Sequence, residues 1–276
     1  MKENEAKACQ KDWTNEARYR AYGICVELRS SQSALLDAAA AHLPLGWHPL
    51  PETGARPEVT FVYRLHQSTE PNKEYRLYYN DKLLSQSANL PEVLTTLENH
   101  AELYTAYHAK DYLFIHAGVV AWKGEIILIP GRSMSGKTTL THALLHAGAT
   151  YYSDEFALLD AEGLVHPYPV PLSIRKGGAI VGEKHPLEKL GIQAGTDPLP
   201  LGLIVVAKYQ RYARWQPKIL PPAEAMLALM DNAVAARGEP AFSMPILKKV
   251  AMGAKTIASK RGEAKRVARA ILEEMR

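Results

Sequence analysis

The sequence predicts a mixed α/β protein, in which a small α+β domain precedes a larger P-loop-containing α/β core. The main reason is the glycine-rich run Gly131–Thr138, which stands between an apolar run typical of a strand and an amphipathic run typical of a helix. The pattern of apolar residues also changes near residue 111, from short runs that alternate with polar residues to nearly continuous apolar runs. With 276 residues, the chain is long enough for two modest domains. We therefore expect one domain at 1–108 and another at 109–276.

The first domain shows short strand-like runs followed by one long helix. Apolar residues alternate loosely over 18–29, which predicts a strand. The β-rich runs 59–66 and 74–79 are separated by a turn-like segment, which predicts a hairpin. Pro91 in a first turn, followed by apolar residues every three or four positions, predicts a helix over 89–108. These elements give an α+β arrangement.

The second domain begins with apolar strands and continues as alternating helices and strands. A break at Gly118 predicts two separate strands, and Gly148 is a natural helix stop. The predicted strands are 112–115, 119–122, 125–129, 150–153, 156–159 and 201–207, and the predicted helices are 137–147, 223–237 and 264–275.

Composition excludes several classes of protein. The two cysteines, Cys9 and Cys25, have no metal-binding spacing, which argues against a zinc finger or a disulfide scaffold and fits a reducing compartment. No run of apolar residues is long enough to span a membrane. The segment 1–10 lacks the apolar centre of a signal peptide. We therefore expect a cytoplasmic protein with no membrane partner.

The glycine-rich run matches the phosphate-loop pattern GxxxxGK[ST] in full. In such loops, backbone N–H groups and the N-terminus of the following helix bind phosphate groups. Lys137 would neutralise charge on the β- and γ-phosphates, and the Thr138 hydroxyl would bind Mg²⁺. The sequence therefore predicts a site for a nucleoside triphosphate, taken to be ATP. Its predicted binding residues are Gly131, Arg132, Ser133, Met134, Ser135, Gly136, Lys137, Thr138 and Thr139.

Two acidic residues, Asp154 and Glu155, follow the next predicted strand. At the carboxyl end of a strand beside a phosphate loop, one carboxylate can hold a metal ion while the other accepts a proton. Adjacent side chains of a strand point to opposite faces, so both can serve only if the chain turns there. His116 follows another strand, and a lone histidine in that position is more often a hydrogen-bonded core residue.

Four segments occur in an order and spacing that resemble a known family. They are 115–120 (Ile-His-Ala-Gly-Val-Val), the phosphate loop, 153–155 (Ser-Asp-Glu) and 172–175 (Leu-Ser-Ile-Arg). Together they resemble the catalytic domain of HPr kinase/phosphorylase and, more distantly, the phosphoenolpyruvate carboxykinase superfamily. The shorter HPr-kinase-like proteins of bacterial peptide natural-product clusters are the most similar. The resemblance covers residues 111–180 strongly and the remaining C-terminal part weakly.

The resemblance implies roles for individual residues. Asp154 matches the aspartate that deprotonates an acceptor serine, and Glu155 falls on the second acid of the pair, a metal ligand. His116 matches a histidine close to the transferred phosphoryl group. Thr138 takes the Mg²⁺-binding role.

One signature segment departs from the family pattern. Arg175 is retained as a phosphate clamp, but Ser173 replaces the glutamate that assists metal binding. Because a hydroxyl is a poorer Mg²⁺ ligand than a carboxylate, we expect kinase chemistry without the reverse phosphorolysis.

The implied function is an ATP- and Mg²⁺-dependent kinase acting on a serine or threonine hydroxyl of a small protein or peptide. Two alternatives remain open: a kinase of serine-like small molecules, and a non-catalytic nucleotide-sensing partner. Label transfer to free metabolites would indicate the first, and activity that survives Asp154→Asn would indicate the second. The domain at 1–108 is the candidate for acceptor recognition. HPr kinases form oligomers, so self-association is a further expectation.

The C-terminal part is basic. Residues 201–276 contain 14 basic and 6 acidic side chains. Within it, 208–215 interleaves cations with aromatic residues, a pattern able to stack bases, clamp phosphates or bind an acidic peptide. A solvated strand end and hairpin is the more common interpretation, and without an RNA-binding motif we expect no nucleic-acid partner. The apolar stripe of the last helix predicts packing on the protein's own core rather than on a membrane.

Overall fold

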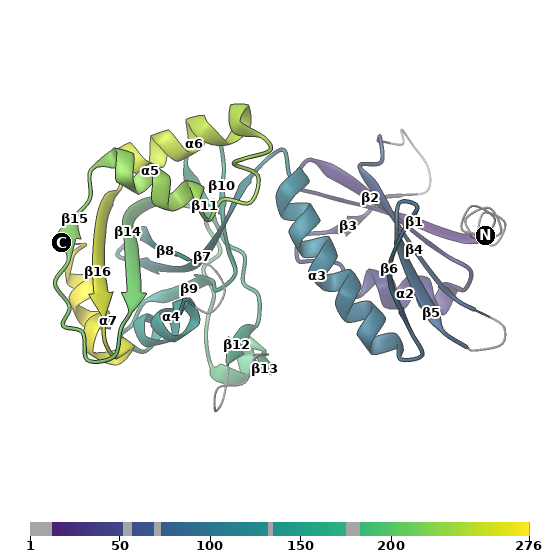
Figure 1. Cartoon of the computed structure of the whole chain (residues 1–276), viewed down its shortest axis with the longest axis horizontal. Helices are drawn as coiled ribbons and strands as arrows, with labels where there is room; N and C mark the ends of the chain where they lie inside the picture. The colour runs from purple at the N-terminus through teal and green to yellow at the C-terminus, as the bar shows by residue number, and fades with distance from the viewer. Residues whose placement is uncertain (1–12, 52–56, 69–72, 132–134, 175–182, 276) are drawn as a thin grey trace. The chain divides into compact units, whose positions relative to one another are not determined.

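The computed structural model describes residues 13–51, 57–68, 73–131, 135–174 and 183–275. The chain divides into two compact units between Lys110 and Asp111 (Figure 1). Each unit contains one large sheet, and the second unit also contains a two-stranded sheet. The mixed α/β class predicted from the sequence is therefore confirmed.

The first unit is a six-stranded sheet with two helices on one face. Its strands, in the sheet order β3-β1-β2-β4-β5-β6, are β3 (His48–Pro49), β1 (Asn15–Ala21), β2 (Ile24–Ser30), β4 (Phe61–Gln67), β5 (Tyr75–Tyr79) and β6 (Lys82–Ser87). The helices are α2 (Ser33–Ala40) and α3 (Leu90–His108). Apolar residues of both helices share one buried cluster with residues of β2, β4 and β5. The predicted long helix and the hairpin β4–β5 are thus confirmed.

The strand predicted over 18–29 is wrong, because the chain reverses in its middle. β1 and β2 pair antiparallel as a hairpin around Tyr22 and Gly23, which have φ angles of 51° and 77°. Two consecutive positive φ angles define the tight turn that joins twisted strands. Tyrosine seldom adopts a positive φ, and this is why the turn could not be recognised in the sequence.

The second unit is built on an eight-stranded sheet. The strands of this sheet are β7 (Leu113–Trp122), β8 (Glu125–Pro130), β9 (Thr150–Ser153), β10 (Phe156–Leu159), β11 (Leu164–His166), β14 (Leu199–Tyr209), β15 (Lys218–Ile219) and β16 (Lys255–Arg261). The helices are α4 (Lys137–His146), the short 3₁₀ helix η2 (Leu187–Leu190), α5 (Pro222–Met230), α6 (Pro240–Gly253) and α7 (Ala264–Glu273). The small sheet pairs β12 (Leu172–Ile174) with β13 (Glu183–His185).

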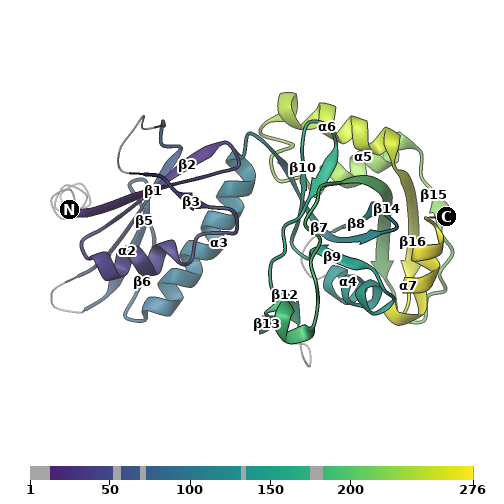
Figure 2. The ribbon, with the colours of Figure 1, turned by 180° about the vertical axis from the view of Figure 1, so that it is seen from behind.

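Helices cover both faces of the large sheet (Figures 1 and 2). α4 and α7 pack on one face, and α5 and α6 pack on the other, each pair over its own buried apolar cluster. β14 runs parallel to β8 and β16, while its first residues pair antiparallel with β11. The carboxyl ends of these three strands therefore share one edge of the sheet, which in α/β folds is the edge that binds ligands.

Two predictions for the second unit are wrong in detail. β7 runs unbroken through Gly118, where two strands were expected. The helix predicted over 223–237 ends at Met230, because the following backbone pairs with β7 instead: the His116 N–H donates to the Asn232 carbonyl oxygen at 2.9 Å. A separate helix, α6, then follows. The final helix is confirmed and buries its apolar stripe against the core. No helix in the described part of the chain is long and apolar enough to cross a membrane.

Candidate active site

The connection from β8 to α4 carries the predicted phosphate loop. α4 begins at Lys137, preceded by Gly136 in the left-handed conformation with φ 89°. Gly131 follows β8, and a Cβ atom there would lie 2.6 Å from the Ser135 Oγ, so the close approach requires glycine. Thr139 is exposed on the first turn of the helix. Arg132, Ser133 and Met134 lie outside the described residues.

The end of this loop is held by a residue that sequence reasoning missed. Arg261, at the end of β16, is 2% exposed and donates a hydrogen bond from Nη2 to the Gly136 carbonyl oxygen at 2.9 Å. At its other end, the loop is tied to β7, because the Gly131 N–H donates to the His116 carbonyl oxygen at 3.2 Å. Both ends of the predicted loop are therefore fixed to neighbouring strands.

The acidic pair Asp154–Glu155 lies where β9 gives way to β10. Both strands pair antiparallel with β7, and the chain bends at the two acidic residues between them. Ser153 stabilises this bend, because its hydroxyl accepts hydrogen bonds from the N–H groups of Glu155 at 3.2 Å and Phe156 at 3.1 Å. The two carboxylates have different surroundings: Asp154 is 6% exposed, whereas the Glu155 side chain is 42% exposed.

Asp154 lies beneath α4 in a pocket bounded by Gly118 and Thr141. A Cβ atom on Gly118 would lie 2.2 Å from the Thr141 Oγ1 and 3.8 Å from the Asp154 Oδ1, so only glycine leaves room for both. Thr138 and Thr141 are three residues apart and share this face of α4. Within the described part of the chain, the Asp154 Oδ1 and the Thr141 Oγ1 are buried and make no hydrogen bond of ordinary geometry, although both threonine hydroxyls lie close enough to the carboxyl to lower its pKa. A buried oxygen without a partner is costly, so its presence requires an explanation, of which a functional role is one.

The surroundings of Asp154 change its acidity. Burial raises the pKa of the Asp154 carboxyl to about 6, and the nearby Glu155 carboxylate acts in the same direction. The Thr138 hydroxyl and the Lys137 ammonium partly counteract this increase in the pKa. A carboxylate with a raised pKa is a better proton acceptor than an ordinary aspartate, and it is still largely ionised at neutral pH.

His116 lies beside Glu155, the more exposed member of the acidic pair. Its Nδ1 is 3.5 Å from the Glu155 Oε1, and its ring centroid is 4.4 Å from that of Phe156. The imidazole side chain is 31% exposed, so it is available at the surface of the site. It is not the fully buried core histidine that a lone histidine in a strand would suggest.

Most of the predicted site residues therefore come together where β8 ends. The described members of this group are His116, Lys137, Thr138, Asp154 and Glu155. Arg175 lies outside the described residues, while Ser173 lies in β12. Besides Arg261, the sequence assigned no role in the site to Thr141, nor to Gly118 and Ser153, although these two lie in the segments that resemble the family. The threonine spacing on one helix face was a usable signal for Thr141, whereas the others depend on tertiary contacts.

Comparison with solved structures finds chains of similar fold. The chain is similar to the solved structure of the HPr(Ser) kinase/phosphatase from Coxiella burnetii, with 14% sequence identity and a TM-score of 0.35. The match covers 58% of this chain and 94% of that chain. No protein-family model and no curated protein sequence matches the chain.

Proposed function

We propose that this protein is an ATP- and Mg²⁺-dependent kinase that transfers the γ-phosphoryl group to a serine or threonine hydroxyl of a small protein or peptide. The observation that carries the proposal is Asp154: it is buried against the first turns of α4, its Oδ1 makes no hydrogen bond of ordinary geometry among the described residues, and its pKa is raised to about 6. A buried carboxylate whose pKa is raised, beside a helix that follows a phosphate-loop sequence, is suited to accept a proton from a hydroxyl.

The triphosphate would be held by the loop amides and by Lys137 at the N-terminus of α4. The residues present also fit Mg²⁺, because the buried Asp154 oxygen, the Thr138 hydroxyl and the Glu155 carboxylate are the hard oxygen donors this ion prefers. We assign the ion to Thr138 and Glu155. When bound, Mg²⁺ neutralises charge on the phosphate oxygens. No cluster of three or more His, Cys, Asp or Glu side chains suited to a metal occurs in the described part of the chain. An Mg²⁺ site completed by phosphates requires only one or two carboxylates.

In the proposed reaction, Asp154 accepts the proton of the acceptor hydroxyl. The hydroxyl oxygen forms a bond to the γ-phosphorus, and the bond from this phosphorus to the β–γ bridging oxygen breaks, so that ADP leaves with the bonding electrons. Lys137 stabilises negative charge on the phosphoryl oxygens. His116, beside Glu155 at the surface of the site, would contact the phosphoryl group as it moves. Arg175 would act as a further clamp.

The test is transfer of label from γ-labelled ATP, with Mg²⁺, to polypeptides in an extract of host cells. We expect one small polypeptide to be labelled by the wild-type protein and not by Asp154→Asn. Asp231→Asn, at an exposed position, is the matched control and should behave as wild type. Label found only in small solutes would indicate a metabolite kinase. ATP binding without any transfer, in any of the proteins, would contradict a kinase and favour a nucleotide sensor.

A further inference from the structure

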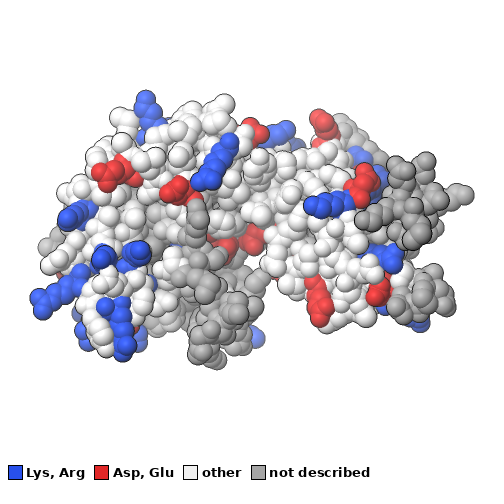
Figure 3. Space-filling view, viewed as in Figure 1, with Lys and Arg blue, Asp and Glu red and all other residues white. Residues whose placement is uncertain are grey.

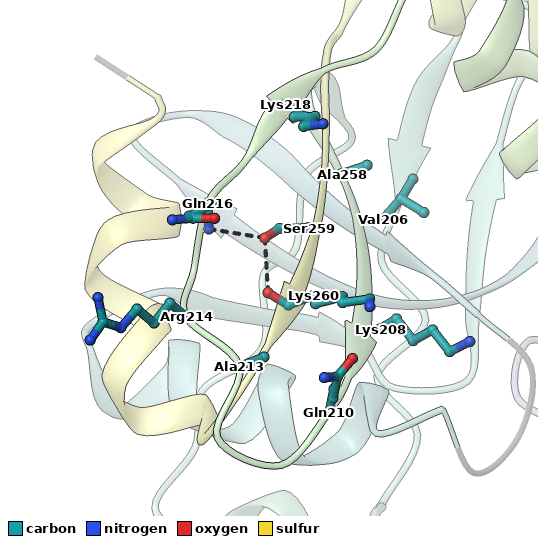
Figure 4. A pocket seen from close by; sticks show the side chains of 10 residues that line it. All are labelled: Val206, Lys208, Gln210, Ala213, Arg214, Gln216, Lys218, Ala258, Ser259 and Lys260. Atoms are coloured by element: carbon teal, nitrogen blue, oxygen red, sulfur yellow. Dashed lines mark hydrogen bonds between the residues drawn. The ribbon is translucent and has the colours of Figure 1, made fainter.

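A basic groove lies where β14 and β16 end. Its volume is about 650 Å³. The segment 213–218 crosses beside the two strand ends and forms the other wall of the groove (Figure 4). Lys and Arg side chains gather over this end of the strands (Figure 3). Four of the lining residues are cationic and none is acidic, so the groove suits an anionic ligand. The residues that line it are Val206, Lys208, Gln210, Ala213, Arg214, Gln216, Lys218, Ala258, Ser259 and Lys260.

The groove and the predicted phosphate loop lie at the same edge of the sheet but on opposite faces. Val206 packs against the apolar cluster under α5 and α6, and Lys208 shares its face because it lies two residues further along β14. Lys260 pairs with Lys208 and belongs to the same face. The next residue, Arg261, points to the other face and bonds to Gly136 at the end of the loop. The groove is therefore a separate surface beside the strands that position the loop.

Two lysines lie next to each other in the groove without an acidic neighbour. β14 and β16 run parallel, and their register places Lys208 beside Lys260 (Figure 4). Lys218 lies one strand further on, opposite Ala258 in the pairing of β15 with β16. Like charges side by side on one face of a sheet are destabilising. Within the described part of the chain, none of the four groove cations forms an ion pair.

Cations on the sheet of the first unit are compensated, which makes the groove unusual for this chain. There, Arg18 on β1 and Arg29 on β2 both form ion pairs with the buried carboxylate of Glu27. Arg64 on β4 pairs with Asp81 at 3.0 Å. The described residues supply no such acid to the groove. Its cations are therefore available to an anion from outside.

The aromatic residues that interleave with cations in this part of the sequence do not line the groove. Tyr209 lies beneath the guanidinium of Arg261, on the other face of β14. Tyr212 lies beneath Arg211, and Trp215 packs against the apolar cluster under α4 and α7. The groove therefore offers no platform on which bases could stack, which argues against a nucleic acid as its ligand.

The layout of the groove favours a polypeptide segment. One cation comes from each strand end, and Arg214 and Lys218 come from the crossing segment (Figure 4). A row of carboxylates along an extended chain can contact cations distributed in this way. The carboxamides of the two glutamines in the lining can both donate to and accept from a peptide backbone. Val206 and Ala258 supply a small apolar floor for the methylene groups of acidic side chains.

The parts of this chain outside the described residues do not contain such an acidic segment. Only 69–72 among them has an excess of acidic over basic residues, and that excess is one residue, Glu70. The segments 132–134 and 175–182 are basic. A partner must therefore supply the carboxylates, and the partner that the proposed function requires is the acceptor polypeptide.

We propose that the basic groove binds a carboxylate-rich segment of the acceptor polypeptide. The inference rests on the proposed function, because it takes the partner to be the phosphoryl acceptor. The contact adds to the one expected for the unit before residue 109. Since the groove and the phosphate loop lie on opposite faces of the sheet, loss of the groove charges should weaken acceptor binding without changing ATP binding or the transfer step.

The first test measures binding of a fluorescein-labelled oligoglutamate peptide by fluorescence anisotropy, with no nucleotide present. The double variant Lys208→Gln/Lys260→Gln removes two groove charges, and Lys189→Gln/Lys248→Gln makes the same change in net charge at exposed positions outside the groove. We expect the groove variant to bind the peptide about tenfold more weakly and the control variant to bind it as wild type does. Added salt should weaken binding, because the contacts are between exposed charges.

Affinities for nucleotide show whether the variants act on the groove alone. Binding of ATP and of inorganic tripolyphosphate, which has the phosphates but no nucleoside, should be unchanged in both variants. Unchanged thermal unfolding would show that the variants are folded.

The second test measures transfer of label to the acceptor polypeptide identified with the wild-type protein. In the groove variant, the KM for the acceptor should rise about tenfold while kcat stays at the wild-type value. The control variant should show neither change.

The outcomes separate the two proposals. Equal weakening of oligoglutamate binding in both variants would overturn the groove, because it would reflect net charge alone. A wild-type protein that does not bind oligoglutamate but transfers label would also overturn it and leave the kinase standing. Tighter binding of a single-stranded oligonucleotide than of oligoglutamate, lost in the groove variant, would overturn it in favour of a phosphate backbone.

Two further results concern the acceptor itself. An unchanged KM in the groove variant would overturn the acceptor as the occupant, and loss of self-association by that variant would then identify a second copy of the chain instead. A wild-type protein that binds oligoglutamate but transfers no label to any polypeptide would refute the proposed function, and the acceptor assignment with it.

Discussion

The guanidinium of Arg261 donates a hydrogen bond to the carbonyl oxygen of Gly136 at 2.9 Å, which joins the end of β16 to the first turn of α4 across 125 residues of sequence. The same carbonyl oxygen accepts the first helical hydrogen bond, from the Leu140 N–H at 3.2 Å. Gly136 leaves no room for a larger residue, because a Cβ atom on it would lie 2.6 Å from the Arg261 Nη2. This contact positions the segment on which the proposed triphosphate site depends.

We predict that Arg261→Met weakens the binding of ATP and of tripolyphosphate to the same extent, by about tenfold, because it loosens the loop and not the base contacts. Calorimetric titration of both ligands measures this. The matched control is Arg266→Met, an exposed position on α7, which should bind both ligands normally. Tenfold weaker binding of ATP with normal tripolyphosphate binding would show that Arg261 does not act through the loop.

Asp154→Asn should make the protein more stable while it removes phosphoryl transfer. The pKa of the Asp154 carboxyl is raised to about 6 in the folded protein, so the folded state binds this proton more tightly than the unfolded chain. The corresponding stability is present at low pH and is lost as the pH rises toward and through 6. At pH 8 the amide should therefore increase the free energy of unfolding by about 1–3 kcal/mol.

Urea unfolding at pH 5 and at pH 8 measures this effect. The gain from Asp154→Asn should be larger at pH 8, and the exposed control Asp231→Asn should show no such dependence. A destabilised Asp154→Asn protein at pH 8 would mean that the carboxylate stabilises the fold through a pairing of its own.

The rate of phosphoryl transfer should fall as the pH drops below about 6. The proton acceptor in the proposal is the ionised form of Asp154, whose pKa is about 6. A pH profile of the transfer rate, measured at saturating ATP, should show a single acidic limb near that value. A rate that stays constant down to pH 4.5 would exclude Asp154 as the proton acceptor.

Gly118→Ala should destabilise the second unit, and Thr141→Ala should rescue it. The added methyl group would lie 2.2 Å from the Thr141 Oγ1, and overpacking of this kind costs about 1–3 kcal/mol. That hydroxyl makes no hydrogen bond of ordinary geometry among the described residues, although it lies close enough to the Asp154 carboxyl to lower the pKa of that group, so its removal alone should cost no more than about 1 kcal/mol. Urea unfolding of both single variants and of the double variant measures the rescue. Gly253→Ala, where an added Cβ meets no neighbour within 4 Å, is the control. A double variant as unstable as Gly118→Ala alone would show that the clash lies elsewhere.

Glu27 should stabilise the first unit against acid. Its side chain is 1% exposed and pairs with Arg18 at 2.6 Å and with Arg29. Burial by itself would raise the pKa of Glu27, but the hydrogen bonds from the two arginines outweigh burial and lower it. The resulting stability is present above the ordinary pKa of a glutamate and is lost as the pH falls through the lowered value.

Glu27→Gln should therefore unfold the first unit more easily at pH 7, by about 1–3 kcal/mol, with a smaller difference near pH 3. Thermal unfolding followed by circular dichroism at the two pH values measures this. Glu58→Gln is the exposed control. An equal effect at both pH values would point to a loss of packing rather than of charge.

Sequence patterns predicted the elements whose signal is local. The strand 125–129 and the helix after the phosphate loop were predicted to within a residue or two. Both are indicated by the spacing of their apolar residues and by the glycines at their ends. The strands on either side of the acidic pair were predicted at the observed residues, with the second expected to continue the first. Conversely, the turn at Tyr22 carries no turn-forming residue before its glycine. Gly118 is required because a larger residue would clash with Thr141, and it does not mark the end of a strand.

The sequence motifs identified residues of the candidate site but not their burial or their contacts. His116, Asp154 and Glu155 could be selected from their order along the chain, but their different burial depends on where α4 packs. Arg261 could not be selected, since its partner Gly136 is remote in sequence and the same strand end carries an exposed lysine, Lys260. The proposed roles of the unit before residue 109 in acceptor recognition, and of self-association, remain predictions.

The central claim, that Asp154 acts in transfer and not in holding ATP, is tested most directly by measuring both steps in one variant. For Asp154→Asn and wild type, ATP affinity is determined by calorimetry, and transfer of label to the acceptor polypeptide by single-turnover kinetics. We predict an ATP affinity within about threefold of wild type and a transfer rate lower by a factor of about 10²–10⁴, the usual contribution of a general base. Transfer at the wild-type rate, or a loss of ATP affinity as large as the loss of transfer, would contradict the account.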